Sequence, residues 1–136
     1  MIGFSNASYT KLNNAYPQDA ATLLDGLLLP EETIHSAFKG DRNWVVFTDR
    51  RLIVATPQGM TGKRTEYTFL PYSAMRAHSI ELPGRPSDTA GKLDLWFADL
   101  GLYGIMGATG PCIMYLEFAA GVDLLGLERF VASRIR

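Results

Sequence analysis

Between positions 31 and 118, hydrophobic and polar residues alternate with a period of two, which is typical of β-strands with one buried face. Ile34 and Phe38, for example, fall on one face of such a strand, whereas His35 and Lys39 fall on the other. β-Branched and aromatic residues are common in these runs, and turn residues such as glycine, proline and aspartate separate them. The pattern therefore predicts seven strands, at 34–39, 44–48, 52–56, 65–70, 76–82, 93–97 and 112–118.

The chain before this β region is less regular. Pro17 suits the first turn of a short helix over 18–25, because its fixed φ angle already matches the helical value. Residues 1–16 are polar, with scattered aromatic side chains and no period, so we expect a loosely held arm there. The prediction is an arm with a short helix over 1–29, followed by a β domain over 30–136.

After the last predicted strand, the pattern returns to helical spacing. Asp123 is suited to cap this helix, because its carboxylate can accept a hydrogen bond from an amide of the first turn. Apolar residues then recur three or four positions apart, at Leu124, Leu127, Val131 and Ile135. The open end of a small β-barrel leaves an apolar opening that such a helix can close. The sequence thus predicts a mainly β fold, a sandwich or partly open barrel closed by a C-terminal helix.

Four segments together resemble the bacterial pleckstrin-homology (PH) domain family. They are IHSAFK at 34–39, VFTDRRLI at 46–53, GMTGKRTEY at 59–67 and PYS at 71–73. The resemblance extends from about position 31 to the C-terminus, and Gly121-Val122-Asp123 opens the final helix in a similar way. It implies a PH-like fold of two roughly orthogonal antiparallel sheets with seven strands and a capping helix. It also implies assembly into homo-oligomeric rings and a role in binding or scaffolding.

Composition narrows the class of protein. The chain has 136 residues, of which 47% are hydrophobic, and this suits one globular domain and excludes intrinsic disorder. A formal net charge of −1 argues against a nucleic-acid partner. The single cysteine excludes an internal disulfide framework. The first residues lack the positive charge and apolar stretch of a targeting segment, so we expect a cytoplasmic protein.

Residues suited to catalysis are few and scattered. His35 and His78 lie inside predicted strands, where a histidine on a strand face is the simpler interpretation than a base or a metal ligand. Cys112 begins an apolar strand and is expected to be a small buried side chain. The segment at 61–64 departs from the Walker phosphate-binding motif at two positions. We therefore expect no catalytic residues, no cofactor and no metal site.

Basic residues cluster in two predicted turns. The resemblance to PH domains implies that the loops at 40–43, 57–64 and 99–111 gather at one end of the fold. This end would carry the basic side chains Lys39, Arg42, Lys63 and Arg64. Each basic side chain near an anionic membrane surface contributes about 1 kcal/mol of attraction. Two interpretations stay open, ordinary solvated loop charge or weak contact with an anionic lipid or phosphate.

The segment 101–111 is rich in glycine and, like all positions from 100 to 116, carries no charge. It is too short to span a membrane. Its apolar side chains, Leu102, Tyr103, Ile105 and Met106, would form a contact patch if the loop were exposed. Such a patch would serve self-association or shallow membrane insertion. A loop that folds back over a sheet edge or the barrel mouth is an equally open interpretation.

Two functional hypotheses follow from these observations. The favoured one is a non-catalytic scaffold or adaptor that self-associates into a ring-shaped homo-oligomer and presents its loops to a protein partner. The alternative is a peripheral membrane or anionic-ligand module that uses the basic turns together with the glycine-rich loop.

Overall fold

The computed structural model describes residues 8–60, 64–85, 89–98 and 112–135, which form eight strands and two α-helices. The strands are β1 (Ser8–Ala15), β2 (Ile34–Lys39), β3 (Trp44–Thr48), β4 (Arg51–Gln58), β5 (Arg64–Pro71), β6 (Met75–Glu81), β7 (Thr89–Phe97) and β8 (Cys112–Ala119). The helices are α1 (Pro17–Leu23) and α2 (Leu124–Arg134), and a 3-10 turn, η1 (Tyr72–Ala74), joins β5 to β6.

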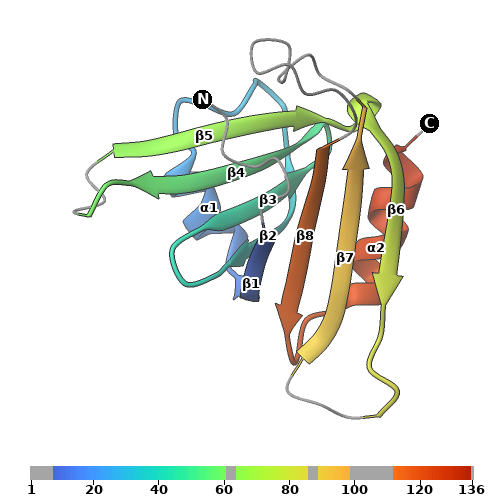
Figure 1. The fold of residues 1–136 in the computed structure, drawn as a ribbon. Coiled ribbons are helices and arrows are strands. Elements are labelled where there is room, and N and C mark those ends of the chain that lie inside the picture. The colour runs from blue at the N-terminus through green and yellow to red at the C-terminus, as the bar shows by residue number, and fades with distance from the viewer. Residues whose placement is uncertain (1–7, 61–63, 86–88, 99–111, 136) are drawn as a thin grey trace, which may run out of the picture.

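All eight strands belong to one sheet, in the order β5-β4-β3-β2-β1-β8-β7-β6. Strands β2 to β5 form a first half-sheet and β6 to β8 form a second, and each half is antiparallel. Figure 1 shows the strands of one half running across those of the other, so the sheet curls around its interior. The predicted mainly β architecture with a C-terminal helix is confirmed, although the two expected sheets are halves of one continuous sheet.

Strand β1 joins the two halves, and it corrects the prediction of only seven strands and, over residues 8–15, the prediction of a loosely held arm, whose first seven residues lie outside the described part of the chain. It pairs antiparallel with β2 through residues 13–15 and parallel with β8 through residues 8–12. Only Tyr9 and Leu12 are buried, three positions apart, because a bulge interrupts the register between them. Lys11 lies in that bulge with φ +57°, a conformation that turns the strand from one half-sheet to the other. The bulge hides the alternation by which strands are normally predicted.

Helix α2 closes the interior as the sequence predicts. The Asp123 carboxylate accepts a hydrogen bond from the backbone N–H of Gly126 at 3.0 Å, which satisfies one free amide of the first turn. Leu124, Leu127 and Val131 are buried in the main core with the inner side chains of both half-sheets. In Figure 1, α2 lies behind β6 and β7.

Helix α1 covers the outer face of the first half-sheet. Its Ala20, together with Leu24 just after the helix, packs on Ala37, Val46 and Ile53 in a second, smaller core. Strands β3 and β4 are therefore buried on both faces, and their sequences read as nearly unbroken apolar runs.

A buried polar cluster fixes the connection between α1 and β2. The Glu32 carboxylate, whose side chain is 0% exposed, accepts hydrogen bonds from Nε and Nη2 of Arg51, both at 2.9 Å. The hydroxyl of Thr48 donates to the same carboxylate at 2.7 Å, and Nη2 of Arg51 also donates to the carbonyl of Leu27. Burial raises the pKa of Glu32, but the hydrogen bonds from Arg51, Leu29 and Thr48 outweigh it and hold the pKa below its ordinary value.

Candidate functional site

The first predicted basic turn lies between β2 and β3. The guanidinium of Arg42 donates a hydrogen bond to the carbonyl of Gly59 at 3.1 Å, so this turn and the turn after β4 are in contact. Lys39 is exposed at the end of β2, and its Nζ lies 5.4 Å from the centroid of the Trp44 ring. The structure therefore brings these two predicted basic residues to the same end of the first half-sheet.

Both residues border a shallow hollow of about 340 Å³ between this turn and the end of α1. Its lining is mixed, and comprises Leu23, Lys39, Asp41, Arg42, Trp44, Ala55, Pro57 and Thr65. Asp41 offsets part of the positive charge. Arg64 is exposed at the start of β5 but does not line the hollow. Lys63 lies outside the described residues, as do Leu102, Tyr103, Ile105 and Met106 of the predicted interaction loop.

The two histidines make structural contacts. His35 stacks on Phe130 of α2 with 3.8 Å between ring centroids. Nε2 of His78 lies 2.8 Å from a carboxylate oxygen of Glu128, which ties β6 to α2. Cys112 is fully buried. Within residues 8–60, 64–85, 89–98 and 112–135, no group of three His, Cys, Asp or Glu side chains is placed to hold a metal.

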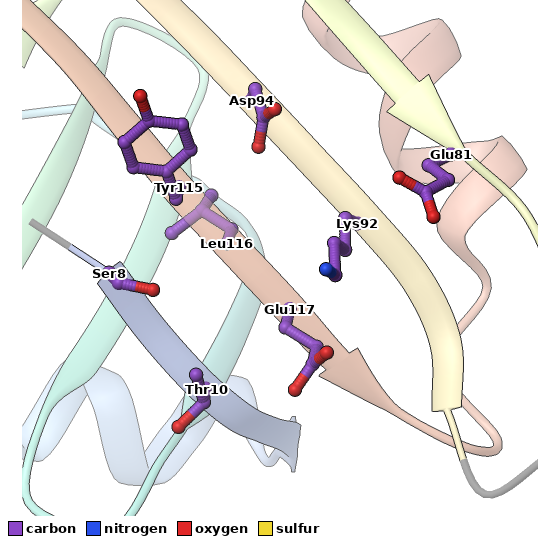
Figure 2. A pocket seen from close by; sticks show the side chains of 8 residues that line it. All are labelled: Ser8, Thr10, Glu81, Lys92, Asp94, Tyr115, Leu116 and Glu117. Atoms are coloured by element: carbon purple, nitrogen blue, oxygen red, sulfur yellow. The ribbon is translucent and has the colours of Figure 1, made fainter. Parts of the chain in front are cut away.

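The outer face of the second half-sheet carries a second surface, the acidic face, made of Glu81, Lys92, Asp94, Tyr115 and Glu117. Figure 2 shows these side chains on three adjacent strands, with Ser8 and Thr10 of β1 beside them. They line an open pocket of about 340 Å³. Three carboxylates surround one ammonium group, so the pocket carries a formal charge of −2.

Cross-strand register explains how the acidic face forms. Lys92 is paired directly with Glu81 on one side and with Glu117 on the other, so charges of opposite sign alternate along one row. Asp94 occupies the next row, opposite Tyr115 and Ser79. Burial raises the pKa of Asp94, and Glu81 raises it further against the opposing effect of Lys92.

The sheet ends in two long edge strands. Among the described residues, no strand pairs with the outer edge of β5 or with the outer edge of β6. These strands have 8 and 7 residues, and Figure 1 shows them diverging from the corner formed by η1. Unpaired edges present backbone N–H and C=O groups that can pair with another chain.

Comparison with known families agrees with this topology, because the family described as "Bacterial PH domain" matches residues 3–135. The chain belongs to the bacterial PH domain family. A relative from Bacillus subtilis strain 168, the uncharacterized protein YjqA, is 39% identical over 125 residues, which cover 90% of this chain and 92% of the relative.

Solved structures of bacterial PH domains share the fold. A DUF1696 family protein with a pleckstrin-homology domain from Shewanella loihica PV-4 aligns with a TM-score of 0.70 and 26% identity, over 92% of this chain and 97% of the other. A pleckstrin-homology domain from Shewanella amazonensis SB2B aligns with a TM-score of 0.60 and 28% identity, over 96% and 93% of the two chains. The PH-like fold is thereby confirmed. No described helix of this bacterial PH domain is long and apolar enough to cross a membrane.

The acidic face of this bacterial PH domain was not predicted from the sequence. The alternation Lys92, Leu93, Asp94, Leu95 already places both charges on the outer face of a strand. Glu81 and Glu117 are far away in sequence, however, and only the register of β6, β7 and β8 brings them beside Lys92.

Proposed function

We propose that this bacterial PH domain is a non-catalytic scaffold that self-associates into a homo-oligomeric ring and presents its loops to a protein partner. The observation that carries the proposal is the open sheet, with both β5 and β6 unpaired among the described residues. Two different edges on one chain favour a head-to-tail contact, in which β5 of one copy meets β6 of the next. Such heterologous contacts close into a ring when the rotation between copies permits it.

Light scattering coupled to size-exclusion chromatography tests self-association. We expect a single discrete assembly whose mass is a whole multiple of the 15.0 kDa chain. Analytical ultracentrifugation over a range of concentrations provides the control, because a specific ring keeps its size whereas non-specific aggregates continue to grow. A chain that stays monomeric at high micromolar concentration would contradict the proposal.

A second candidate function is weak binding to an anionic surface. The observation in its favour is the joint placement of Lys39 and Arg42 on one hollow, linked through Gly59 to the turn before Arg64. Each of these basic side chains would contribute about 1 kcal/mol near an anionic membrane, and salt would screen the contribution.

Sedimentation with vesicles of phosphatidylcholine, with and without phosphatidylserine, tests this second candidate. We expect salt-sensitive binding only to the anionic vesicles, and weaker binding after Lys39→Glu and Arg42→Glu. Arg50→Glu serves as the control, because Arg50 is exposed in the turn between β3 and β4, at the other end of these strands. Inorganic phosphate as a competitor distinguishes a general anion site from a lipid surface. Equal binding to both kinds of vesicle would contradict the second candidate.

A further inference from the structure

No described helix covers the outer face of the second half-sheet, which β6, β7 and β8 form. Helix α1 packs on the outer face of the first half-sheet, whereas α2 packs on the interior. In Figure 1, α2 lies behind β6 and β7, and no helix lies in front of them. The outer side chains of this half-sheet are therefore placed to meet another molecule.

Three rows of side chains cross this outer face. Cross-strand register forms the rows Ala77, Trp96, Ile113, then Ser79, Asp94, Tyr115, then Glu81, Lys92, Glu117. Successive rows are two residues apart along β7, which separates them by about 7 Å. The face thus changes from apolar to acidic over about 14 Å.

The apolar end of the face is unusual for the solvent side of a sheet. Trp96 and Ile113 are half-buried, and Tyr115 in the next row is exposed. The solvent side of an antiparallel sheet normally carries polar residues. Tryptophan and tyrosine are also the side chains most enriched where one protein contacts another. This end of the face therefore has the composition of a contact surface.

The acidic end offers negative charge that the described residues do not neutralise. Among them, none of the carboxylates of Glu81, Asp94 and Glu117 forms an ion pair. Lys92 offsets one of these three charges, so the pocket keeps its formal charge of −2. Burial raises the pKa of Asp94, so a cation beside it would stabilise a carboxylate that water solvates poorly.

The guanidinium group of arginine fits this combination of side chains. It donates two parallel hydrogen bonds to a carboxylate, and its flat face stacks on an aromatic ring. Figure 2 shows the Tyr115 ring and the Asp94 carboxylate on neighbouring strands of one face. The same carboxylates repel the phosphates of an anionic membrane or a nucleic acid. Charge complementarity therefore favours a basic protein segment as the occupant.

We propose that this outer face binds an arginine-containing segment of another protein, extended along β7, with an apolar side chain over Trp96 and arginine side chains over the acidic face. Every second residue of an extended segment points to the same side, about 7 Å apart, which matches the spacing of the rows. The partner pattern is an apolar residue followed by two arginines at alternate positions. The inference rests on the proposed scaffold role in taking a protein as the occupant, but it does not require the ring.

Fluorescence anisotropy with a defined peptide tests the docking surface. The probe is a fluorescein-labelled peptide with leucine, arginine and arginine at alternate positions and serine between them. A peptide of the same composition with adjacent arginines is the matched control. We expect salt-sensitive binding of the probe, about threefold tighter than binding of the control peptide, because the control loses one charge contact.

Charge variants locate the binding. We expect Glu81→Lys and Glu117→Lys each to weaken binding of the probe roughly tenfold, and Tyr115→Ser to weaken it about threefold. Lys92→Met should tighten binding, because it removes the one positive charge from the pocket. Asp25→Lys is the matched control and should leave the affinity unchanged, since Asp25 is exposed just after α1, on the other half-sheet. Circular dichroism establishes that each variant folds.

Tryptophan emission provides an independent measurement. A saturating concentration of the probe should shift the emission of Trp96 in the Trp44→Phe protein. The emission of Trp44 in the Trp96→Phe protein should stay unchanged, because Trp44 lies on β3 in the first half-sheet. A shift of Trp44 alone would place the peptide on the wrong half and overturn the inference.

The outcomes separate this inference from the proposed ring. Equal weakening by Asp25→Lys and Glu81→Lys, or weaker binding after Lys92→Met, would overturn the docking surface. Binding that disappears as the protein assembles would show that a second copy covers the face, and would overturn the assignment to another protein. A monomeric wild type that binds the probe would overturn the ring alone. A discrete assembly that binds neither peptide would overturn the docking surface alone.

Discussion

At the scale of single residues, the pair formed by Glu32 and Arg51 stands out among the polar interactions. The Glu32 side chain is fully buried, whereas the Arg51 side chain is 19% exposed, and two hydrogen bonds of 2.9 Å join the carboxylate to the guanidinium. A buried ion pair adds little to stability compared with an apolar pair, but removal of one partner leaves an uncompensated charge. The pair fixes the segment after α1 against the turn between β3 and β4.

Glu32→Gln should lower the free energy of unfolding by about 2–3 kcal/mol, because Arg51 would lose its charged partner while staying largely buried. Chemical denaturation measures the change. Arg50→Ala is the matched control. Arg50 is exposed, and its Nε lies 4.0 Å from a carboxylate oxygen of Asp49, so water screens this ion pair. Loss of the Arg50 side chain should lower the free energy of unfolding by less than about 0.5 kcal/mol. Equal stability of the Gln variant and the wild type would contradict the structural role of Glu32.

His35 should make the fold sensitive to mild acid. Desolvation of the ring, and then the positive charge of Arg134, lower the pKa of His35 from its ordinary value of about 6.5. The folded state therefore binds a proton at His35 less readily than the unfolded state does. The neutral ring contributes its full share to the free energy of unfolding at a pH above about 6.5, and this contribution declines as the pH falls below that value. His35→Phe keeps an aromatic ring against Phe130 but does not titrate.

We expect the stability of the wild type relative to His35→Phe to decrease as the pH falls below about 6.5. Urea denaturation of both proteins at several pH values measures this difference and cancels the contribution of the other titrating groups. If the stability of the wild type relative to His35→Phe stays constant with pH, or increases in acid, then the pKa of His35 is not lower in the folded state than in the unfolded state.

At the scale of elements, the hairpin of β6 and β7 depends on one glycine. Gly91 has φ +126°, and a Cβ atom at this position would collide with the backbone carbonyl of Glu81 and contact Leu124 of α2. The register of β7 against β8 shifts between Thr89 and Gly91, so the glycine occupies a bulge. The close approach of β6, β7 and α2 at this end of the core requires a residue without a side chain.

Gly91→Ala should therefore destabilise the protein by about 3 kcal/mol or more, through backbone strain and the displaced carbonyl. Thermal unfolding provides the measurement. Gly84→Ala, in the connection that precedes β7, is the matched control because open space surrounds its Cβ position. Similar melting temperatures for the two variants would mean that the bulge tolerates a side chain.

At the scale of the whole molecule, β1 makes one cooperative unit of two half-sheets. Leu12 is 0% exposed and belongs to the main core, and β1 hydrogen-bonds to both β2 and β8. The two tryptophans fall in different halves, with Trp44 on β3 and Trp96 on β7. Each tryptophan can therefore report on the unfolding of its own half.

In the single-tryptophan variants Trp44→Phe and Trp96→Phe, the fluorescence transitions in denaturant should coincide after correction for the stability of each variant. Leu12→Ala, added to either one, should lower stability by about 2–5 kcal/mol and shift both transitions together. Two separate transitions would show that the halves unfold independently and that β1 does not couple them.

Features that depend on residues close together in the sequence were predicted, whereas features that depend on contacts between distant residues were missed. Seven strands and both helices were predicted, since their alternation, turn residues and caps are local features of the chain. Strand β1 was missed because the bulge at Lys11 breaks its period. The covering of the first half-sheet by α1 was also missed, although the apolar runs Val45–Phe47 and Leu52–Val54 indicate strands buried on both faces.

The sequence by itself determined seven of the strands, both helices and, through its resemblance to a known family, the PH-like class of the fold, because a strand or helix depends mainly on neighbouring residues. Only the tertiary structure decided which residues distant in sequence share a surface. The row of Glu117, Lys92 and Glu81 exists because three strands align at one register, and the open edges exist because β1 completes the sheet without closing it. Register and closure arise from the packing of the whole chain around one core, and no local pattern encodes them.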